Sequence, residues 1–267
     1  MNNYGNLFPL QVNQSIPYNM EIFLIICSSV ILLSVIIYAI YRLKGHRDPV
    51  LLYTMGAGIF AFFNAGNLQV LLHVTQPSNV TYSVFRNYGM PVPLGPGIGY
   101  AAIFPLVSYI IYRYIKNGVT KKGLITIWAV TCLADLLIGI PAVAAGFYVY
   151  HAPQMLTLFG FPLYNIWING TSIILGSVMM YFFVPVLTDW KLPAISFLPF
   201  FGFAAGWGIM DIPVVLALNS AGMPPWGQWV LLLVSLTFSV LILASLISMV
   251  ATDSKSKWEL PWEELNR

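Results

Sequence analysis

The sequence predicts an all-α, polytopic membrane protein with seven transmembrane helices. The chain has 267 residues, of which 58% are hydrophobic and only 8% are charged, whereas about 25% are charged in a typical soluble domain. Apolar runs of the length that a helical span needs, about 20 residues, recur along the whole chain. The Lys and Arg residues fall between these runs with a strong bias to one side. These three observations together determine the predicted fold class.

The first apolar run is predicted to be a retained helix. Residues 1–19 contain no Lys or Arg, so they lack the basic segment of a cleavable signal peptide. We expect three regions: an outer N-terminal segment over 1–19, a transmembrane bundle over 20–251 and a cytoplasmic tail over 252–267. The seven predicted spans are 20–43, 50–73, 95–116, 122–147, 162–187, 193–219 and 226–251.

The distribution of cations predicts the orientation in the membrane. Eleven of the twelve Lys and Arg residues fall on one side of the predicted bundle, and only Arg86 falls on the other. Because positive residues accumulate in cytoplasmic loops, the N-terminus is predicted to be outside and the C-terminus inside, in the plasma membrane. Tyr148, Tyr150, Trp226 and Trp229 are expected at the outer interface, where aromatic side chains are enriched.

Three spans are preceded by the same short pattern. Gly, then Met or Phe, then Pro occurs in Gly89–Pro91, Gly160–Pro162 and Gly222–Pro224, before spans three, five and seven. Glycine permits a sharp turn and proline is tolerated in the first helical turn, so each pattern predicts a helix entry from the outer side.

The spacing of these entries predicts repeated helical hairpins. Asn64 precedes Gly89 by 25 residues, and Asp135 precedes Gly160 by the same number. Two matched offsets indicate that spans two–three and four–five are parallel copies of one hairpin. Spans six–seven are interpreted as a third, more compact copy.

Two acidic residues lie inside predicted spans. Asp135 occurs in "CLADLLIGIPAV" of span four and Asp211 in "GWGIMDIPVV" of span six, with no Lys or Arg at the same apolar depth. An ionised carboxylate without a cation is costly there, so we expect both to be protonated at neutral pH and to donate hydrogen bonds. Both are candidate catalytic residues. The alternative is a structural role, either between helices or on carbonyl groups freed by nearby Gly and Pro.

Asparagine and tryptophan residues predict a polar pocket in the outer half of the bundle. In spans two and five the asparagines are spaced by three and four residues, which places each pair on one helix face. If these faces converge, aromatic side chains would form the pocket walls. The predicted substrate-binding residues are Asn64, Asn67, Asn165, Asn169, Trp167 and Trp207.

Other kinds of site have no pattern in the sequence. The spacing of His, Cys and carboxylate residues predicts no metal site, and Cys27 and Cys132 are expected to be packing residues inside apolar runs. There is no P-loop, no nucleophile elbow and no dinucleotide-binding fingerprint, so no cofactor is predicted. Nucleic-acid binding is not expected, because topology already explains the cations.

Several motifs resemble those of a known protein family. "YGMPVPLGPGIGY", "KNGVTKKGLITIWAV", "ADLLIGIP", "FGFPLYNIWINGTS" and "VVLALNS" are similar to motifs of an uncharacterised family of bacterial seven-span membrane proteins, over about two-thirds of the chain. The resemblance implies two further acids, near Asn64 and at Gly139, where this sequence has neutral residues. The Gly-x-Pro-then-Asn helix entry also resembles that of carotenoid hydratases. Span number and membrane carboxylates resemble those of small integral-membrane terpene cyclases.

The sequence therefore supports three hypotheses of function. The first is an enzyme that acts on a lipid or isoprenoid, with Asp135 as the acid, Asp211 as a proton relay and aromatic faces that stabilise a carbocation. The second is a small transporter, which repeats and broken spans also suggest. The third is a non-catalytic membrane subunit that binds a lipid or pigment in a larger complex. The predicted partners are membrane lipids, a hydrophobic small molecule and other membrane proteins.

Overall fold

The computed structural model describes residues 15–77, 79–87, 90–151 and 154–252. For residues 64–70, 87 and 90 it describes the backbone alone. The helices are α1 (Tyr18–His46), α2 (Val50–Leu71), α3 (Leu94–Lys116), α4 (Lys121–Ala144), α5 (Leu163–Phe183), α6 (Phe197–Met210), α7 (Ile212–Asn219) and α8 (Pro225–Val250), with 3-10 turns η2 (Val184–Val186) and η3 (Asp189–Ser196). The short strands are β1 (Val74–Thr75), β2 (Ser83–Asn87), β3 (Met90–Pro93), β4 (Val149–Tyr150), β5 (Thr157–Leu158) and β6 (Phe161–Pro162).

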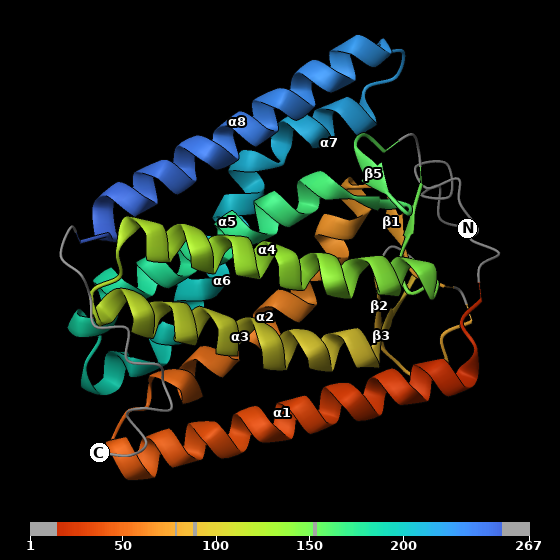
Figure 1. Ribbon diagram of the computed structural model, residues 1–267. Helices are drawn as coiled ribbons and strands as arrows, with labels where there is room; N and C mark the ends of the chain where they lie inside the picture. Colours follow the sequence, from red (N-terminus) through yellow and green to blue (C-terminus); the bar gives the residue numbers. More distant parts are fainter. Residues whose placement is uncertain (1–14, 78, 88–89, 152–153, 253–267) are drawn as a thin grey trace.

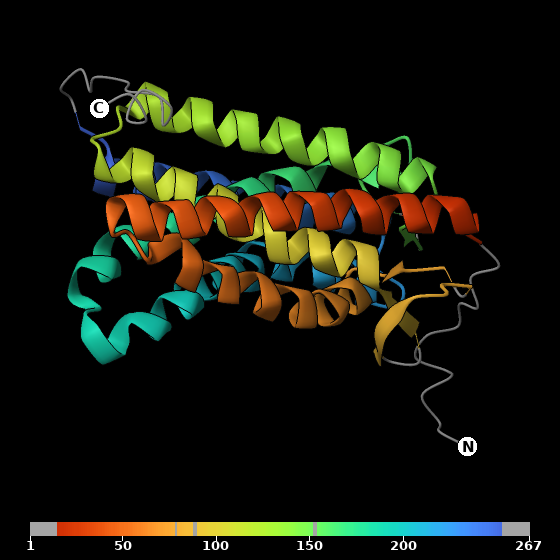
Figure 2. The ribbon, with the colours of Figure 1, turned by 90° about the horizontal axis from the view of Figure 1, so that it is seen from below.

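The long helices lie side by side in one bundle. They run along a common direction, with α1 and α8 on opposite sides (Figure 1) and the same alignment in the perpendicular view (Figure 2). The strands gather at one end of the bundle, which we call the strand end. The opposite end, where α1 ends and α2 begins, carries every described Lys and Arg except Arg86, and we call it the basic end.

Six helical segments in the described part of the chain are long and apolar enough to cross a membrane. The prediction of a helical, multipass membrane protein is thereby confirmed in its coarse form. The described apolar stretch of α2, Val50–Phe63, is shorter than the other six. The six segments are Tyr18–His46, Leu94–Lys116, Lys121–Ala144, Leu163–Val186, Asp189–Met210 and Pro225–Val250.

The predicted sixth span is interrupted. α6 ends at Met210 and α7 begins at Ile212, so Asp211 lies at the junction between them. Pro213 provides the local cause, because proline has no N–H to donate to the carbonyl group four residues earlier and its ring crowds that turn. The break places an acidic side chain beside irregular backbone inside an apolar segment.

The same order of elements occurs twice along the chain. A helix, a two-residue strand, a two-stranded antiparallel ribbon and a second helix follow one another in α2–β1–β2–β3–α3 and again in α4–β4–β5–β6–α5. The equivalent strands β1 and β4 pair with each other in antiparallel fashion, with Val74 opposite Tyr150. This pairing joins the two helical hairpins at the strand end.

A proline stands immediately before each of the helices α3, α5 and α8. Pro162 and Pro224 have extended backbone just before the first helical residue, and the glycines two residues earlier, Gly160 and Gly222, adopt φ near +79° and +78°. In the first copy the pattern ends inside a strand: Pro91 lies in β3, and α3 begins three residues later, at Leu94, one residue before the predicted start of span three. The ribbon β2–β3 is longer than β5–β6 and accounts for this shift.

α5 and α6 approach each other closely because glycines face one another. A Cβ atom on Gly202 would lie 2.2 Å from the Gly176 Cα, and one on Gly176 would lie 2.8 Å from the Pro199 carbonyl oxygen. α5 also packs against α3, α4 and α8, so most of its side chains are buried. The close contact holds the polar face of α5 against α6.

Gly202→Ala is expected to lower the apparent melting temperature of the detergent-solubilised protein. The methyl group would collide with backbone atoms of α5, and overpacking of this kind costs about 1–3 kcal/mol. Gly208→Ala is the matched control on the same helix, since nothing lies within 4 Å of the added methyl group. Equal melting temperatures for both variants would contradict the close contact.

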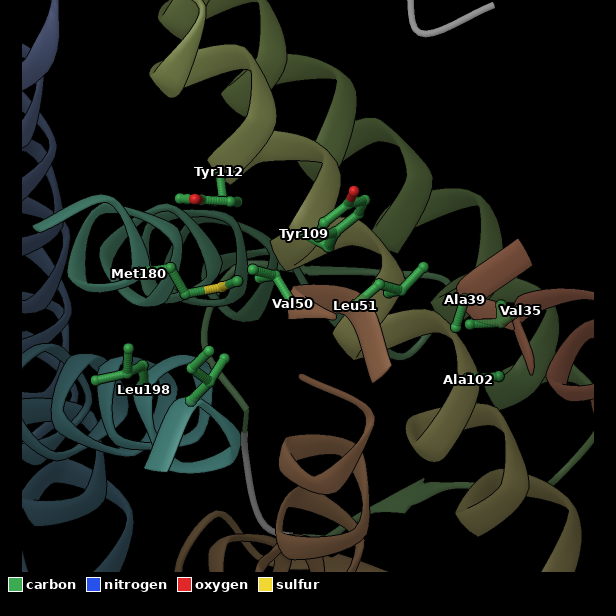
Figure 3. Packing of buried hydrophobic residues seen from close by; sticks show 10 residues of the cluster. Val35, Ala39, Val50, Leu51, Ala102, Tyr109, Tyr112, Met180 and Leu198 are labelled. Atoms are coloured by element: carbon green, nitrogen blue, oxygen red, sulfur yellow. The ribbon is translucent and has the colours of Figure 1, made fainter. Parts of the chain in front are cut away.

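A hydrophobic cluster and an ion cluster tie α1, α2 and α3 together near the basic end. The apolar side chains meet in Figure 3, where Ala39, Leu51 and Ala102 come from three different helices. Beside them Asp48 Oδ2 accepts hydrogen bonds from Tyr109 at 2.5 Å and from two arginines. The arginine contacts are Arg42 Nη2 at 3.1 Å and Arg113 Nη1 at 3.2 Å.

Asp48 remains ionised in this setting. Burial by itself would raise the pKa of the carboxyl group, but hydrogen bonds from Tyr109, the Val50 N–H and Arg42 lower the pKa below its ordinary value. The ion cluster is therefore a charged contact at the basic end that links α1 and α3 to the turn before α2.

The loops at the strand end are held by polar contacts to neighbouring helices. Buried Glu21 of α1 accepts hydrogen bonds from the Thr81 and Tyr82 N–H groups at 3.1 and 2.8 Å. The β1–β4 pair is extended by the His151 N–H, which donates to the His73 carbonyl at 2.8 Å. These contacts form a folded cover over one end of the bundle.

Candidate functional site

A chain of three side chains joins α4, α5 and α6 in the half of the bundle nearer the strand end. Asn169 Nδ2 donates to Asp135 Oδ2 at 2.8 Å, and Trp207 Nε1 donates to Asn169 Oδ1 at 2.9 Å. An indole N–H can only donate, so Trp207 fixes which end of the Asn169 amide faces Asp135. Asp135, Asn169 and Trp207, all predicted site residues, are therefore brought together.

The orientation of Asn169 has a chemical consequence for Asp135. Because the amide donates to Oδ2, that oxygen serves as an acceptor, and a proton on the carboxyl group belongs on Oδ1. Oδ1 has no hydrogen bond to any side chain or backbone group in the described residues. The Asp135 side chain is only partly buried. Its proton-bearing oxygen is therefore held in position without a hydrogen bond to a neighbouring helix.

Three tyrosines that interact with Asp135 were not predicted as site residues. The Asp135 carboxyl group interacts electrostatically with the hydroxyls of Tyr100, Tyr148 and Tyr150. Tyr148 and Tyr150, which were expected at the outer interface, lie at the strand end and pack against the buried cluster that contains Tyr164 and Ile168. Their position depends on the β1–β4 pairing, and no local sequence signal indicates it.

These loop tyrosines are neutral hydrogen-bonding groups. Burial raises the pKa of Tyr148 well above its ordinary value, and nearby Tyr100, Tyr150 and Asp135 add to the effect. Burial also raises the pKa of the Tyr150 hydroxyl, whereas the hydrogen bond from Asn165 acts in the opposite direction. At physiological pH both hydroxyls can therefore donate and accept.

Asp211 is the second predicted catalytic residue and is almost completely enclosed. Its exposed fraction is 3%, and its Oδ1 atom has no hydrogen-bond partner among the described residues. The structural alternative would have this carboxyl group bind a carbonyl freed by the helix break. The Met210 carbonyl at the break accepts its hydrogen bond from Ser235 of α8 instead.

Asn165 lies at the same level as Asp211. α5 and α6 run antiparallel, since Gly202 faces Gly176 and Gly206 faces Ser172 four residues further along each helix. Asn165 lies one turn from Asn169, and Asp211 one turn from Trp207, in the directions that bring them opposite each other. Asn165 Nδ2 donates to the Tyr150 hydroxyl at 3.1 Å, and Asp211 interacts electrostatically with that same tyrosine.

The remaining predicted residues lie differently. Trp167 is 39% exposed and lies outside the Asp135–Asn169–Trp207 chain. Its ring packs edge-to-face against that of Trp128, with 5.9 Å between the ring centroids. The side chains of Asn64 and Asn67 lie outside the described part of the structure. Gly139 packs under the Phe161 ring, since a Cβ there would lie 2.6 Å from two ring carbons. A larger side chain at that position would require Phe161 to move.

A comparison with protein-family models, curated proteins and solved structures finds no match. The family resemblance thus stays a prediction. The interpretation of the site consequently depends on its own residues: two carboxyl groups, a tyrosine that interacts electrostatically with both, and an oriented asparagine.

Proposed function

We propose that the protein is an integral membrane enzyme that transfers a proton from Asp135 to a lipid or isoprenoid substrate. The single observation that carries the proposal is the fixed orientation of the carboxyl group: Trp207 orients Asn169, and Asn169 holds Asp135 Oδ2. A residue whose only role is to join helices needs no such indirect orientation, whereas general acid catalysis requires a positioned proton.

The proposed step is protonation of a carbon–carbon double bond. The π electrons of the substrate form a C–H bond with the Asp135 proton, which leaves a carboxylate on the protein and a carbocation on the adjacent carbon. Loss of a proton from a neighbouring carbon returns it to Asp135 and regenerates the acid. The tyrosines beside Asp135 present π faces and oxygen lone pairs that can stabilise the cation.

The proposal also includes seven membrane-spanning helices and a site in the outer half of the bundle. We propose that α2 is the seventh span, that the basic end faces the cytoplasm of a plasma membrane and that the strand end faces outward. The twice-repeated order of elements and the β1–β4 pairing support the proposed hairpin repeat. The site would then lie in the outer half of the bundle, under the folded cover.

Reporter fusions test this orientation. A green fluorescent protein fused to the C-terminus is expected to fluoresce, because it folds in the cytoplasm, and alkaline phosphatase at the same position is expected to be inactive. Phosphatase inserted after Gly118, in the α3–α4 turn, should also be inactive, while insertion within the α2–α3 loop near Thr81 should be active. The opposite pattern would contradict the proposed topology.

The enzymatic proposal is tested by mass spectrometry of lipid extracts. Cells that produce wild-type protein and cells that produce Asp135→Asn are compared, together with extracts of the gently purified proteins. A lipid whose abundance changes with wild-type protein but not with the variant supports the enzyme. Stoichiometric partner chains without any lipid difference would instead favour a non-catalytic subunit. A substrate-dependent proton flux in proteoliposomes would favour a transporter.

A further inference from the structure

Two buried oxygen atoms on facing helices lack hydrogen-bond partners. Asp211 Oδ1 and Asn165 Oδ1 belong to side chains that are each 3% exposed, and neither atom accepts a hydrogen bond from any donor in the described residues. Buried polar atoms in proteins are nearly always paired with protein, water or ligand. A polar group that paired with both atoms would lie between the two side chains, and we call this region the space.

Tyr150 of β4 interacts with both residues. Its hydroxyl accepts the Asn165 Nδ2 hydrogen bond, so its own hydrogen is available to another acceptor. The same hydroxyl interacts electrostatically with Asp211 and with Asp135. A group that bound here would therefore meet two acceptor oxygens and one donor.

The charges around the space select the kind of occupant. All described Lys and Arg side chains except Arg86 lie at the basic end, away from the space, and Arg86 is an exposed residue of β2. Phosphate recognition uses arginine, lysine or clustered backbone N–H groups. The described residues around Asp211 supply none of these side chains.

We propose that Asp211, Asn165 and Tyr150 form a head-group subsite for the hydroxyl group of an uncharged lipid. A hydroxyl donates one hydrogen bond and accepts others, which matches two acceptors and a tyrosine O–H. The lipid's hydrocarbon chain would then extend from this subsite past Asp135. The inference rests on the proposed function and adds the substrate class: a neutral lipid alcohol rather than a lipid phosphate.

A series of probes with one hydrocarbon skeleton tests the subsite. Binding of tritiated farnesol to the purified protein in detergent is measured by scintillation proximity, with unlabelled farnesol, farnesene and farnesyl diphosphate as competitors. We expect farnesol to compete at a concentration about tenfold lower than farnesene, which corresponds to about 1.4 kcal/mol, and lower than the diphosphate. Tighter binding of the diphosphate, equal binding of farnesene or no saturable farnesol binding would overturn the proposal.

Variants assign the preference to these residues. With Asn165→Leu, farnesol should compete at the same concentration as farnesene. Asp211→Asn, which preserves the shape of the side chain, should reduce the preference for farnesol over farnesene severalfold. Ser172→Ala is the matched control, because its buried hydroxyl also lacks a partner but lies two turns deeper on α5. If Asn165→Leu still binds farnesol more tightly than farnesene, the assignment of the subsite to these residues is wrong. If that variant does not fold, the order of the three competitors in the wild type still decides.

Failure of the subsite is distinguishable from failure of the enzyme. The binding assay needs no turnover and can be repeated with Asp135→Asn, whose head-group subsite is intact. Hydroxyl preference without any lipid change in cells would leave a binding protein and reject catalysis. A lipid change in cells without hydroxyl preference would keep the enzyme and leave an ordered water between Asp211 and Asn165.

Discussion

Asp135→Asn is expected to lower product formation in cells by about 10²- to 10⁴-fold, the range that general acid catalysis contributes. An amide has no acidic proton to transfer. Its carbonyl oxygen can still accept the 2.8 Å hydrogen bond from Asn169, so the fold should persist. The measurement is the ratio of product to precursor ions in lipid extracts, normalised to the amount of membrane-inserted protein.

Two further variants separate chemistry from packing. Thr131→Val, one turn earlier on α4, removes a hydroxyl that bonds only to its own helix and should leave the ratio unchanged. Trp207→Phe keeps an aromatic ring but removes the donor that orients Asn169. It is expected to reduce turnover about tenfold and to alter the pH profile, since the carboxyl group loses its fixed orientation. Unchanged product with Asp135→Asn would reject Asp135 as the acid.

Asp48→Asn is expected to have the largest effect on stability. The substitution removes the charge that Arg42 and Arg113 contact, and Arg42 is only 4% exposed. Breaking a buried ion pair from one side costs about 3 kcal/mol or more, because the remaining charge stays buried. The apparent melting temperature in detergent should therefore fall by about 5–10 °C. Asp189→Asn, an exposed acid in η3 at the same end, should change it little.

The ion cluster also predicts how stability varies with pH. The folded-state pKa of Asp48 lies below its ordinary value, so the stabilisation is present above the ordinary pKa and is lost as the pH falls through the lowered one. Below about pH 4, the apparent melting temperature of the wild-type protein should be lower than at neutral pH. Asp48→Asn should show a smaller loss over the same range. Parallel curves for the two proteins would contradict the ionised state.

Local sequence patterns predict much of the architecture. Apolar length and cation position predict the helices within a few residues, because bilayer thickness and backbone hydrogen bonding impose both. The break at Asp211 was not predicted as a boundary, although Pro213 provides its signal. Pro91 lies in β3, three residues before α3 begins, because the length of the β2–β3 ribbon depends on pairing between strands and not on the proline alone.

The sequence by itself determined the membrane class, the candidate acids and one face of α5, since helical periodicity places Asn165 and Asn169 together. Only the tertiary structure decided which partners these side chains have. Asn169 meets Asp135 and Trp207, whereas Asn165 meets Tyr150. The physical reason is that the glycine contact between α5 and α6 sets their register, and pairing of β1 with β4 directs the tyrosines inward. Both are contacts between segments distant in sequence, which periodicity within one helix does not encode.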